Sequence, residues 1–120
     1  MKLLVCGGRD YNDRAAVFEA LDRAREKRDI TLLIHGACKT GADAIAEEWA
    51  KFREVPYLGH PAQWRATRSK AAGVLRNQAM LDWWEPEGVV AFPGGTGTAD
   101  MIHRAQLAGL PVWEPCAKRA

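Results

Sequence analysis

Short apolar runs alternate with amphipathic stretches along this chain, and this alternation restricts the possible fold more than any other feature. Five runs are long enough for a strand and too short for a helix; they lie at residues 3–6, 30–34, 55–58, 89–92 and 110–113. Between them, apolar residues recur at helical spacing over residues 16–24, 42–52, 75–84 and 98–108. Buried strands separated by helices pair in parallel through right-handed crossovers. The alternation therefore predicts an α/β fold.

We expect a three-layer Rossmann-like domain whose parallel sheet has about five strands in the order 3-2-1-4-5. Pro56 has no backbone N–H, which favours an edge position for its strand. Asn12 or Asp13 can cap the first helix. A length of 120 residues suits one domain, so the prediction is a single Rossmann-like unit over residues 1–120.

Composition argues against several classes of function. The net charge of +2 is too small to indicate nucleic-acid binding by itself. The three cysteines are far apart and lack metal-ligand spacing, so neither a disulfide framework nor a zinc site is indicated. We expect no metal and no cofactor. The N-terminal apolar run is too short for a signal peptide or a membrane span. These features predict a cytoplasmic protein without a membrane partner.

Glycine-bearing loops follow the first, second and fourth predicted strands, at residues 6–11, 35–43 and 93–100. A parallel sheet brings such loops to its carboxyl edge, and the order 3-2-1-4-5 places the first and fourth across one crevice. Glycine lets the backbone approach a ligand, and a helix N-terminus offers unpaired N–H groups. The fourth-strand loop has both properties, so we predict that it binds a phosphate. Its candidate residues are Gly94, Gly95, Thr96, Gly97 and Thr98.

Two common nucleotide-binding motifs are excluded. The second loop has the outer glycine spacing of a P-loop, but Ala42-Asp43 stands where that motif needs Lys-Ser/Thr. The fourth-strand loop lacks the third glycine of the dinucleotide fingerprint, and the second strand ends in His35-Gly36 instead of a ribose-binding acid. The sequence therefore disfavours ATP hydrolysis and NAD binding.

The ordered set of loops resembles the YspA/YpsA-related branch of the SLOG (SMF/DprA–LOG) superfamily. The resemblance runs from about residue 5 to residue 109; residues 93–98 are similar to the PGGxGT signature of LOG proteins. It implies a Rossmann-like fold, a nucleotide-derived ligand and self-association into a homo-oligomer. LOG members hydrolyse the N-glycosidic bond of nucleoside 5′-monophosphates, whereas the DprA branch binds single-stranded DNA.

One departure from the LOG pattern affects the expected chemistry. LOG enzymes carry a catalytic glutamate three residues after the threonine of the motif, where this chain has Met101. Glycoside cleavage needs a carboxylate to activate water or to stabilise the oxocarbenium-like centre. If this chain is an enzyme, that acid must be Asp100, Asp43 or Asp10; our catalytic candidates are Asp43 and Asp100. Neighbouring helical residues point about 100° apart, so Asp100 is not an automatic substitute.

The remaining candidate ligand contacts have structural alternatives. Arg76 matches an arginine of LOG-like proteins and would clamp a phosphate, or it is a solvated helix charge. Arg9 would bind phosphate and Asp10 a ribose hydroxyl, or the two pair with each other or cap the next helix. Asp43 would bind a sugar hydroxyl, or its charge only interacts favourably with the dipole of its own helix. The other candidates are Gly7, Gly8, Gly36, Gly41 and Asn77.

The function that these residues favour is binding of a nucleotide or nucleotide-derived phosphorylated ligand, as a sensor or ligand-processing domain. A phosphoribohydrolase is the second reading. The third is DprA-like binding of single-stranded nucleic acid, which rests only on residues 64–76; we do not expect a nucleic-acid partner. Trp49, Trp83, Trp84 and Trp113 fill the core or form a subunit contact, and the core is the preferred interpretation.

Overall fold

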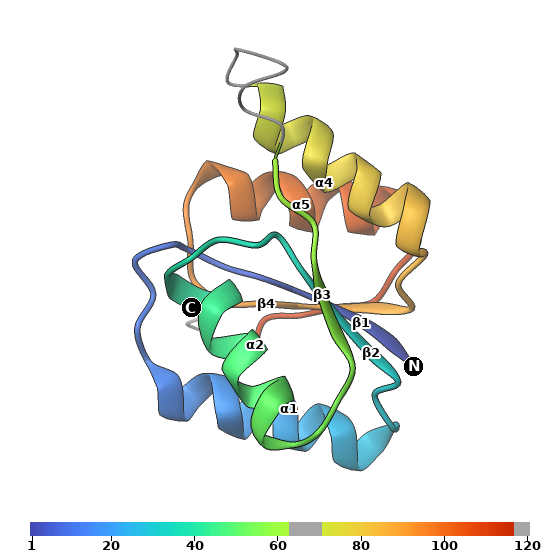
Figure 1. Ribbon diagram of the computed structural model, residues 1–120. Coiled ribbons are helices and arrows are strands. Elements are labelled where there is room, and N and C mark those ends of the chain that lie inside the picture. Colours follow the sequence, from blue (N-terminus) through green and yellow to red (C-terminus); the bar gives the residue numbers. More distant parts are fainter. Residues whose placement is uncertain (63–70, 117–120) are drawn as a thin grey trace.

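The computed structural model describes residues 1–62 and 71–116, and these form a central sheet with helices on both faces (Figure 1). Its elements are β1 (Lys2–Cys6), α1 (Arg14–Lys27), β2 (Leu32–His35), α2 (Gly41–Phe52), β3 (Tyr57–Gly59), α4 (Ala71–Trp84), β4 (Gly88–Ala91), α5 (Thr96–Leu107) and β5 (Val112–Trp113). All strand pairs are parallel, in the order β3-β2-β1-β4-β5. The predicted Rossmann-like α/β fold and strand order are confirmed.

The core lies in two layers, one on each face of the sheet. Strand β1 is central, and its successive side chains alternate between the layers. Leu4 packs with the residues of α4 and α5, whereas Val5 packs with those of α1 and α2. Burial on both faces explains why β1 reads as a continuous apolar run. β3 begins directly after Pro56 and lies at one edge, as its proline predicts.

Helix and strand ends differ from the predicted ends by a few residues. Helix α5 begins at Thr96, two residues before the predicted start, and α4 begins at Ala71 instead of residue 75. Gly97 and Gly73 lie in the first turns of these helices. Because glycine has a low helix propensity, the sequence pattern placed both helix N-termini too late. Asp13 caps α1, because its Oδ1 accepts the N–H of Ala16 at 3.1 Å. The capping prediction is therefore confirmed for one of its two candidates.

The tryptophans do not all lie in the core. Trp49 is fully buried and donates from Nε1 to Asp22 at 2.9 Å. Trp83, however, is 71% exposed, so its core assignment is wrong. Trp84 is half-buried and donates to Nδ1 of His60 at 3.0 Å. Adjacent residues on a helix point about 100° apart, so Trp83 and Trp84 cannot both face the sheet. Trp113, on the edge strand β5, is also exposed.

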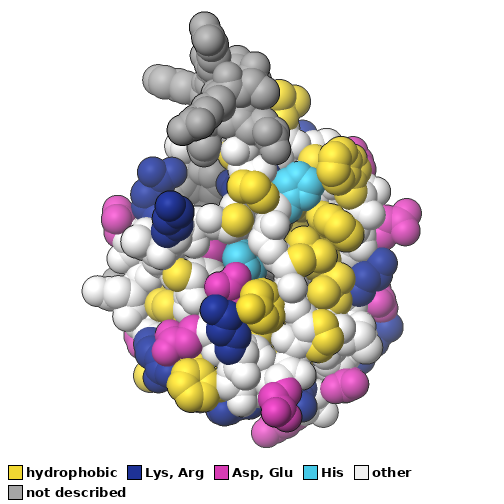
Figure 2. All heavy atoms as spheres, in the orientation of Figure 1, with side chains coloured by type: hydrophobic (Ala, Val, Ile, Leu, Met, Phe, Trp, Pro, Cys, Tyr) yellow, Lys and Arg dark blue, Asp and Glu magenta, His cyan; other side chains and the backbone are white. Residues whose placement is uncertain are grey.

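Apolar side chains gather on the face of the molecule that contains β3 (Figure 2). The exposed aromatic residues there include Tyr57. Trp83 packs edge-on against the ring of His60, with ring centroids 5.2 Å apart.

Within the described parts of the chain, no helix combines the length and apolar character that crossing a membrane requires.

Candidate functional site

A pocket of about 680 Å³ lies at the carboxyl ends of the central strands. Its wall brings together thirteen of the fifteen candidate residues, which come from four separate segments of the chain. They are Gly7, Gly8, Arg9, Asp10, Gly36, Asp43, Arg76, Asn77, Gly94, Gly95, Thr96, Gly97 and Thr98. Gly41 and Asp100 are not among the described residues that line it. The sheet topology therefore assembles one concave site from loops that are far apart in sequence.

The loops after β1 and β4 are in direct contact. The N–H of Gly8 donates to the carbonyl of Pro93 at 2.9 Å. A Cβ at Gly94 would lie 2.6 Å from the Gly8 nitrogen and 2.2 Å from Oγ1 of Thr98, so only glycine fits there. The two glycine loops thus lie beside each other, as the strand order predicts.

Gly41 holds the second loop against the first and does not face the pocket. Its φ is +75°, and an added Cβ would lie 2.2 Å from the carbonyl oxygen of Gly8. On either side of it, Ala42 N–H donates to Gly8 O at 3.2 Å, and Thr40 Oγ1 donates to Arg9 O at 2.8 Å. Gly41 therefore shapes the site through the backbone; direct contact with a ligand stays a prediction for this residue.

The N-terminus of α5 is open toward the pocket. Gly95 is its N-cap and supplies no side-chain cap, and the first backbone bond of the helix runs from Ala99 N–H to Gly95 O at 3.1 Å. Among the described residues, the amides of residues 96–98 have no acceptor. A Cβ added at Gly95 or Gly97 would meet nothing within 4 Å. These free donors, at the positive end of the helix dipole, are suited to an anion.

Arg76, on α4, is hydrogen-bonded to the second glycine loop beside the pocket. Its Nη1 donates to the carbonyl of Gly36 at 2.7 Å, and its Nε donates to Oδ1 of Asn77 at 3.1 Å. A Cβ added at Gly36 would lie 2.5 Å from Nη1 of Arg76, so a larger residue there would displace the guanidinium. The side chain is half-buried. Its role as a phosphate clamp stays a prediction.

Asp43 is the buried carboxylate of the pocket. Only 7% of the residue is exposed, and Oδ2 accepts the N–H of Cys38 at 3.2 Å. Burial raises the pKa of Asp43 above its ordinary value, and the hydrogen bond from Cys38 and the charge of Arg76 oppose this rise. A carboxyl whose pKa is moved toward neutrality is suited to proton transfer.

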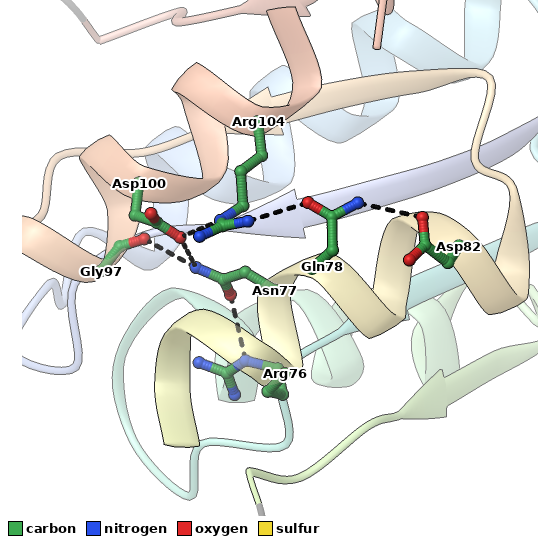
Figure 3. A network of polar contacts seen from close by, with 7 residues as sticks. All are labelled: Arg76, Asn77, Gln78, Asp82, Gly97, Asp100 and Arg104. Carbon is green, nitrogen blue, oxygen red and sulfur yellow. Dashed lines mark hydrogen bonds and ion pairs between the residues drawn. The ribbon is translucent and has the colours of Figure 1, made fainter. Parts of the chain in front are cut away.

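Asp100, unlike Asp43, is bonded to the side chains of Asn77 and Arg104, as Figure 3 shows. Its Oδ2 accepts from Nδ2 of Asn77 at 3.0 Å and from Nε of Arg104 at 2.8 Å. The bond from Asn77 joins α4 to α5, whereas the bond from Arg104 lies within α5. The catalytic assignment of Asp100 stays a prediction, and its carboxylate is already occupied by two donors.

The pocket also contains residues that sequence reasoning did not select, including Cys6, Tyr11, Cys38 and Met80. Tyr11 stacks on Phe92 with ring centroids 5.7 Å apart and is bonded to Sγ of Cys116 at 3.3 Å. Burial raises the pKa of the Cys6 thiol to about 12, so it is not a nucleophile near neutral pH. Met80 lies one helical turn after Arg76, a spacing from which it could have been predicted.

Across residues 1–62 and 71–116, no group of three potential metal ligands is present.

The first half of the chain matches a known family. The model of the family described as "YspA, cpYpsA-related SLOG family" matches residues 1–66. The Gene 61 protein of Mycobacterium phage D29 is 37% identical over 120 residues, which cover 92% of this chain and 93% of that protein. The phosphate-binding candidates of the fourth-strand loop lie beyond the residues that the family model matches.

A solved structure shares the fold. The crystal structure of MurG from Acinetobacter baumannii matches with a TM-score of 0.56 and 13% sequence identity. The match covers 92% of this chain, which spans only 33% of the MurG chain. At this identity the likeness concerns the Rossmann-like fold alone.

Proposed function

Since the chain belongs to the YspA, cpYpsA-related SLOG family, we propose that it binds a nucleotide or nucleotide-derived phosphorylated ligand at the carboxyl edge of its sheet, as a sensor or ligand-processing domain. The observation that carries this proposal is the open N-terminus of α5, where the amides of residues 96–98 have no acceptor among the described residues. The ligand's phosphate binds there.

The rest of the pocket supports a ligand with a sugar next to its phosphate. Arg76 provides a cation beside the anion-binding turn. Asp43 and Asp10 provide carboxylates, which accept hydrogen bonds from sugar hydroxyls and repel further phosphates. A volume of about 680 Å³ lies in the ordinary range of small-ligand sites.

Titration calorimetry with adenosine 5′-monophosphate (AMP) and the other nucleoside 5′-monophosphates tests this proposal. We expect saturable binding of at least one monophosphate and no comparable binding of the matching nucleoside, because the phosphate makes the main contact. A ligand present at 100 times its dissociation constant should also stabilise the fold by about 2.7 kcal/mol. Equal affinity for nucleoside and monophosphate, or binding of neither, would contradict the proposal.

The environment of Asp43 favours a second candidate function, cleavage of the N-glycosidic bond of the bound monophosphate. Water would attack the anomeric carbon and Asp43 would take one proton of that water, while the nucleobase leaves with the bonding electron pair and takes up a proton from solvent; Asp43 then returns its proton to solvent. Only the ionised carboxylate can accept the proton. The rate should therefore rise with pH through the pKa of Asp43, which burial places above the ordinary 3.8.

Release of free adenine from AMP, followed by chromatography, measures this activity. The matched variant is Asp43→Asn, whose amide oxygen can still accept the Cys38 N–H but cannot accept a proton. We expect its rate to fall at least about 100-fold, with loss of the acidic limb of the pH profile. No adenine from the wild type, or equal rates for the two proteins, would remove this candidate.

The nucleic-acid alternative rests on residues 64–76, of which residues 64–70 lie outside the described part of the chain. The part outside includes Trp64 and its neighbouring basic residues.

A further inference from the structure

We propose that Asp100 is a positioning residue that orients the Arg76 guanidinium at the pocket through the side-chain amide of Asn77. The inference rests on the proposed function, because it concerns how Arg76 meets an anionic ligand. It assigns Asp100 a role that neither touches the ligand nor transfers a proton.

The amide of Asn77 is bonded on both of its sides. Its Nδ2 donates to the carbonyl of Gly97 at 3.1 Å and to Oδ2 of Asp100 at 3.0 Å. Its Oδ1 accepts from Nε of Arg76 at 3.1 Å. A flipped amide would turn its oxygen toward two acceptors and its NH₂ toward a guanidinium, which only donates. Asp100 and Gly97 therefore fix the orientation in which Asn77 can hold Arg76.

Asp100 is itself held by a network of polar side chains between α4 and α5 (Figure 3). Arg104, one helical turn along α5, donates from Nε to the same Oδ2 at 2.8 Å. Its Nη1 donates to Oε1 of Gln78 at 2.9 Å, and Gln78 donates in turn to Asp82 at 2.9 Å. Asp100 and Arg104 have side chains only 24% and 27% exposed, so water screens their ion pair incompletely.

Arg76 is consequently held at two of its three nitrogens. Nε is bonded to Asn77 and Nη1 to Gly36, and these two bonds fix the plane of the guanidinium. Its Nη2 has no partner among the described residues, and Arg76 lines the pocket. A cation that is already oriented loses less conformational freedom when a ligand binds. Asp100 thereby contributes to affinity at a distance.

A merely electrostatic role for Asp100 predicts the opposite result. Its negative charge lies in the first part of α5, near the turn that would hold the phosphate. If charge were its only influence, Asp100→Ala and Asp100→Asn would both bind phosphate more tightly. In the positioning account, only Asp100→Ala weakens binding, since an asparagine oxygen at 100 can still accept from Asn77.

Calorimetry with AMP, applied to both variants and to Gln78→Ala, separates these accounts. Gln78→Ala removes the outer end of the same network and leaves the bond between Asn77 and Asp100 in place, so it is the matched control. We expect Asp100→Ala to weaken AMP binding by about tenfold, the loss of roughly one hydrogen bond. Asp100→Asn and Gln78→Ala should stay within about threefold of the wild type, by the same conversion. Unchanged or tighter binding by Asp100→Ala would overturn the inference.

A second readout does not depend on ligand. The ¹H–¹⁵N resonance of the Arg76 Nε–H group should move in Asp100→Ala toward that of a solvated arginine, and should stay in place in Gln78→Ala. An unchanged resonance in Asp100→Ala overturns the inference even if wild-type protein binds no AMP, an outcome that would contradict the proposed function separately. Should Asp100→Ala fail to fold, Asp100→Ser, whose shorter side chain also removes this carboxylate acceptor of Asn77 and leaves the Asn77–Arg76 pair in the chain, must show the same shift.

Discussion

The Gly95→Asp variant is expected to lose phosphate binding while staying at least as stable as the wild type. Gly95 is the N-cap of α5, with φ −97°, so the position accepts an L-residue without left-handed strain. An added Cβ has nothing within 4 Å. The aspartate can therefore cap the free amides of the first turn, which should stabilise the fold by a few tenths of a kcal/mol. The same carboxylate then occupies the place of the ligand's phosphate.

The expected loss of affinity is large. Two hydrogen bonds to a charged group contribute about 3 kcal/mol or more, so AMP should bind at least about 100-fold more weakly to Gly95→Asp. Gly95→Ala is the matched control, because it adds a Cβ at the same position without a capping oxygen or a charge, and it should bind AMP within a few-fold of the wild type. Calorimetry gives the affinities and urea unfolding gives the stabilities. Retained binding by Gly95→Asp would show that the phosphate binds elsewhere.

The Gly41→Ala variant is expected to lose about 3 kcal/mol or more of unfolding free energy, a sum of two costs. The first is left-handed strain at φ +75°, which is about 1–2 kcal/mol for an alanine. The second is the collision of the new Cβ with backbone, 2.2 Å from Gly8 O and 2.6 Å from the Arg9 Cα, which costs a further 1–3 kcal/mol or so. Backbone atoms cannot rotate away as a flexible side chain can.

Gly109→Ala isolates the first of these costs. Gly109 ends α5 with φ +78°, and an added Cβ there meets nothing within 4 Å. This variant should lose only the strain of about 1–2 kcal/mol. Urea unfolding followed by tryptophan fluorescence, to which the buried Trp49 contributes, measures both variants. Equal losses in the two variants would mean that the close contact of α2 with the first glycine loop does not constrain the site.

The fold was predictable because its signals are local and repeated. Each buried strand reads as an apolar run that ends near glycine, and parallel pairing follows from the helices between the strands. Pro56 indicated the edge strand β3. The core prediction for Trp83 was wrong because the apolar spacing along α4 cannot show which of two adjacent tryptophans faces the sheet. Which of them faces the sheet is decided by tertiary packing around His60.

The site was predictable as a set of loops but not as a set of contacts. Glycine spacing and strand order brought Gly8 and Gly94 together, because both properties belong to the backbone. The partner of Asn77 could not be predicted in this way, since its bond to Asp100 joins helices whose facing side chains depend on how α4 and α5 pack. For the same reason the sequence could not show that Asp100, on α5, is not among the described residues that line the pocket, whereas Asp43, at the start of α2, lines it.

Titration of ¹⁵N-labelled protein with AMP, followed at the backbone amides of α5, tests the central claim most directly. We predict that the amide resonances of residues 96–98 shift together and saturate at the dissociation constant that calorimetry gives, while those in the last turn of α5 stay in place. If AMP binds but these amides do not move, the first turn of α5 is not the phosphate site.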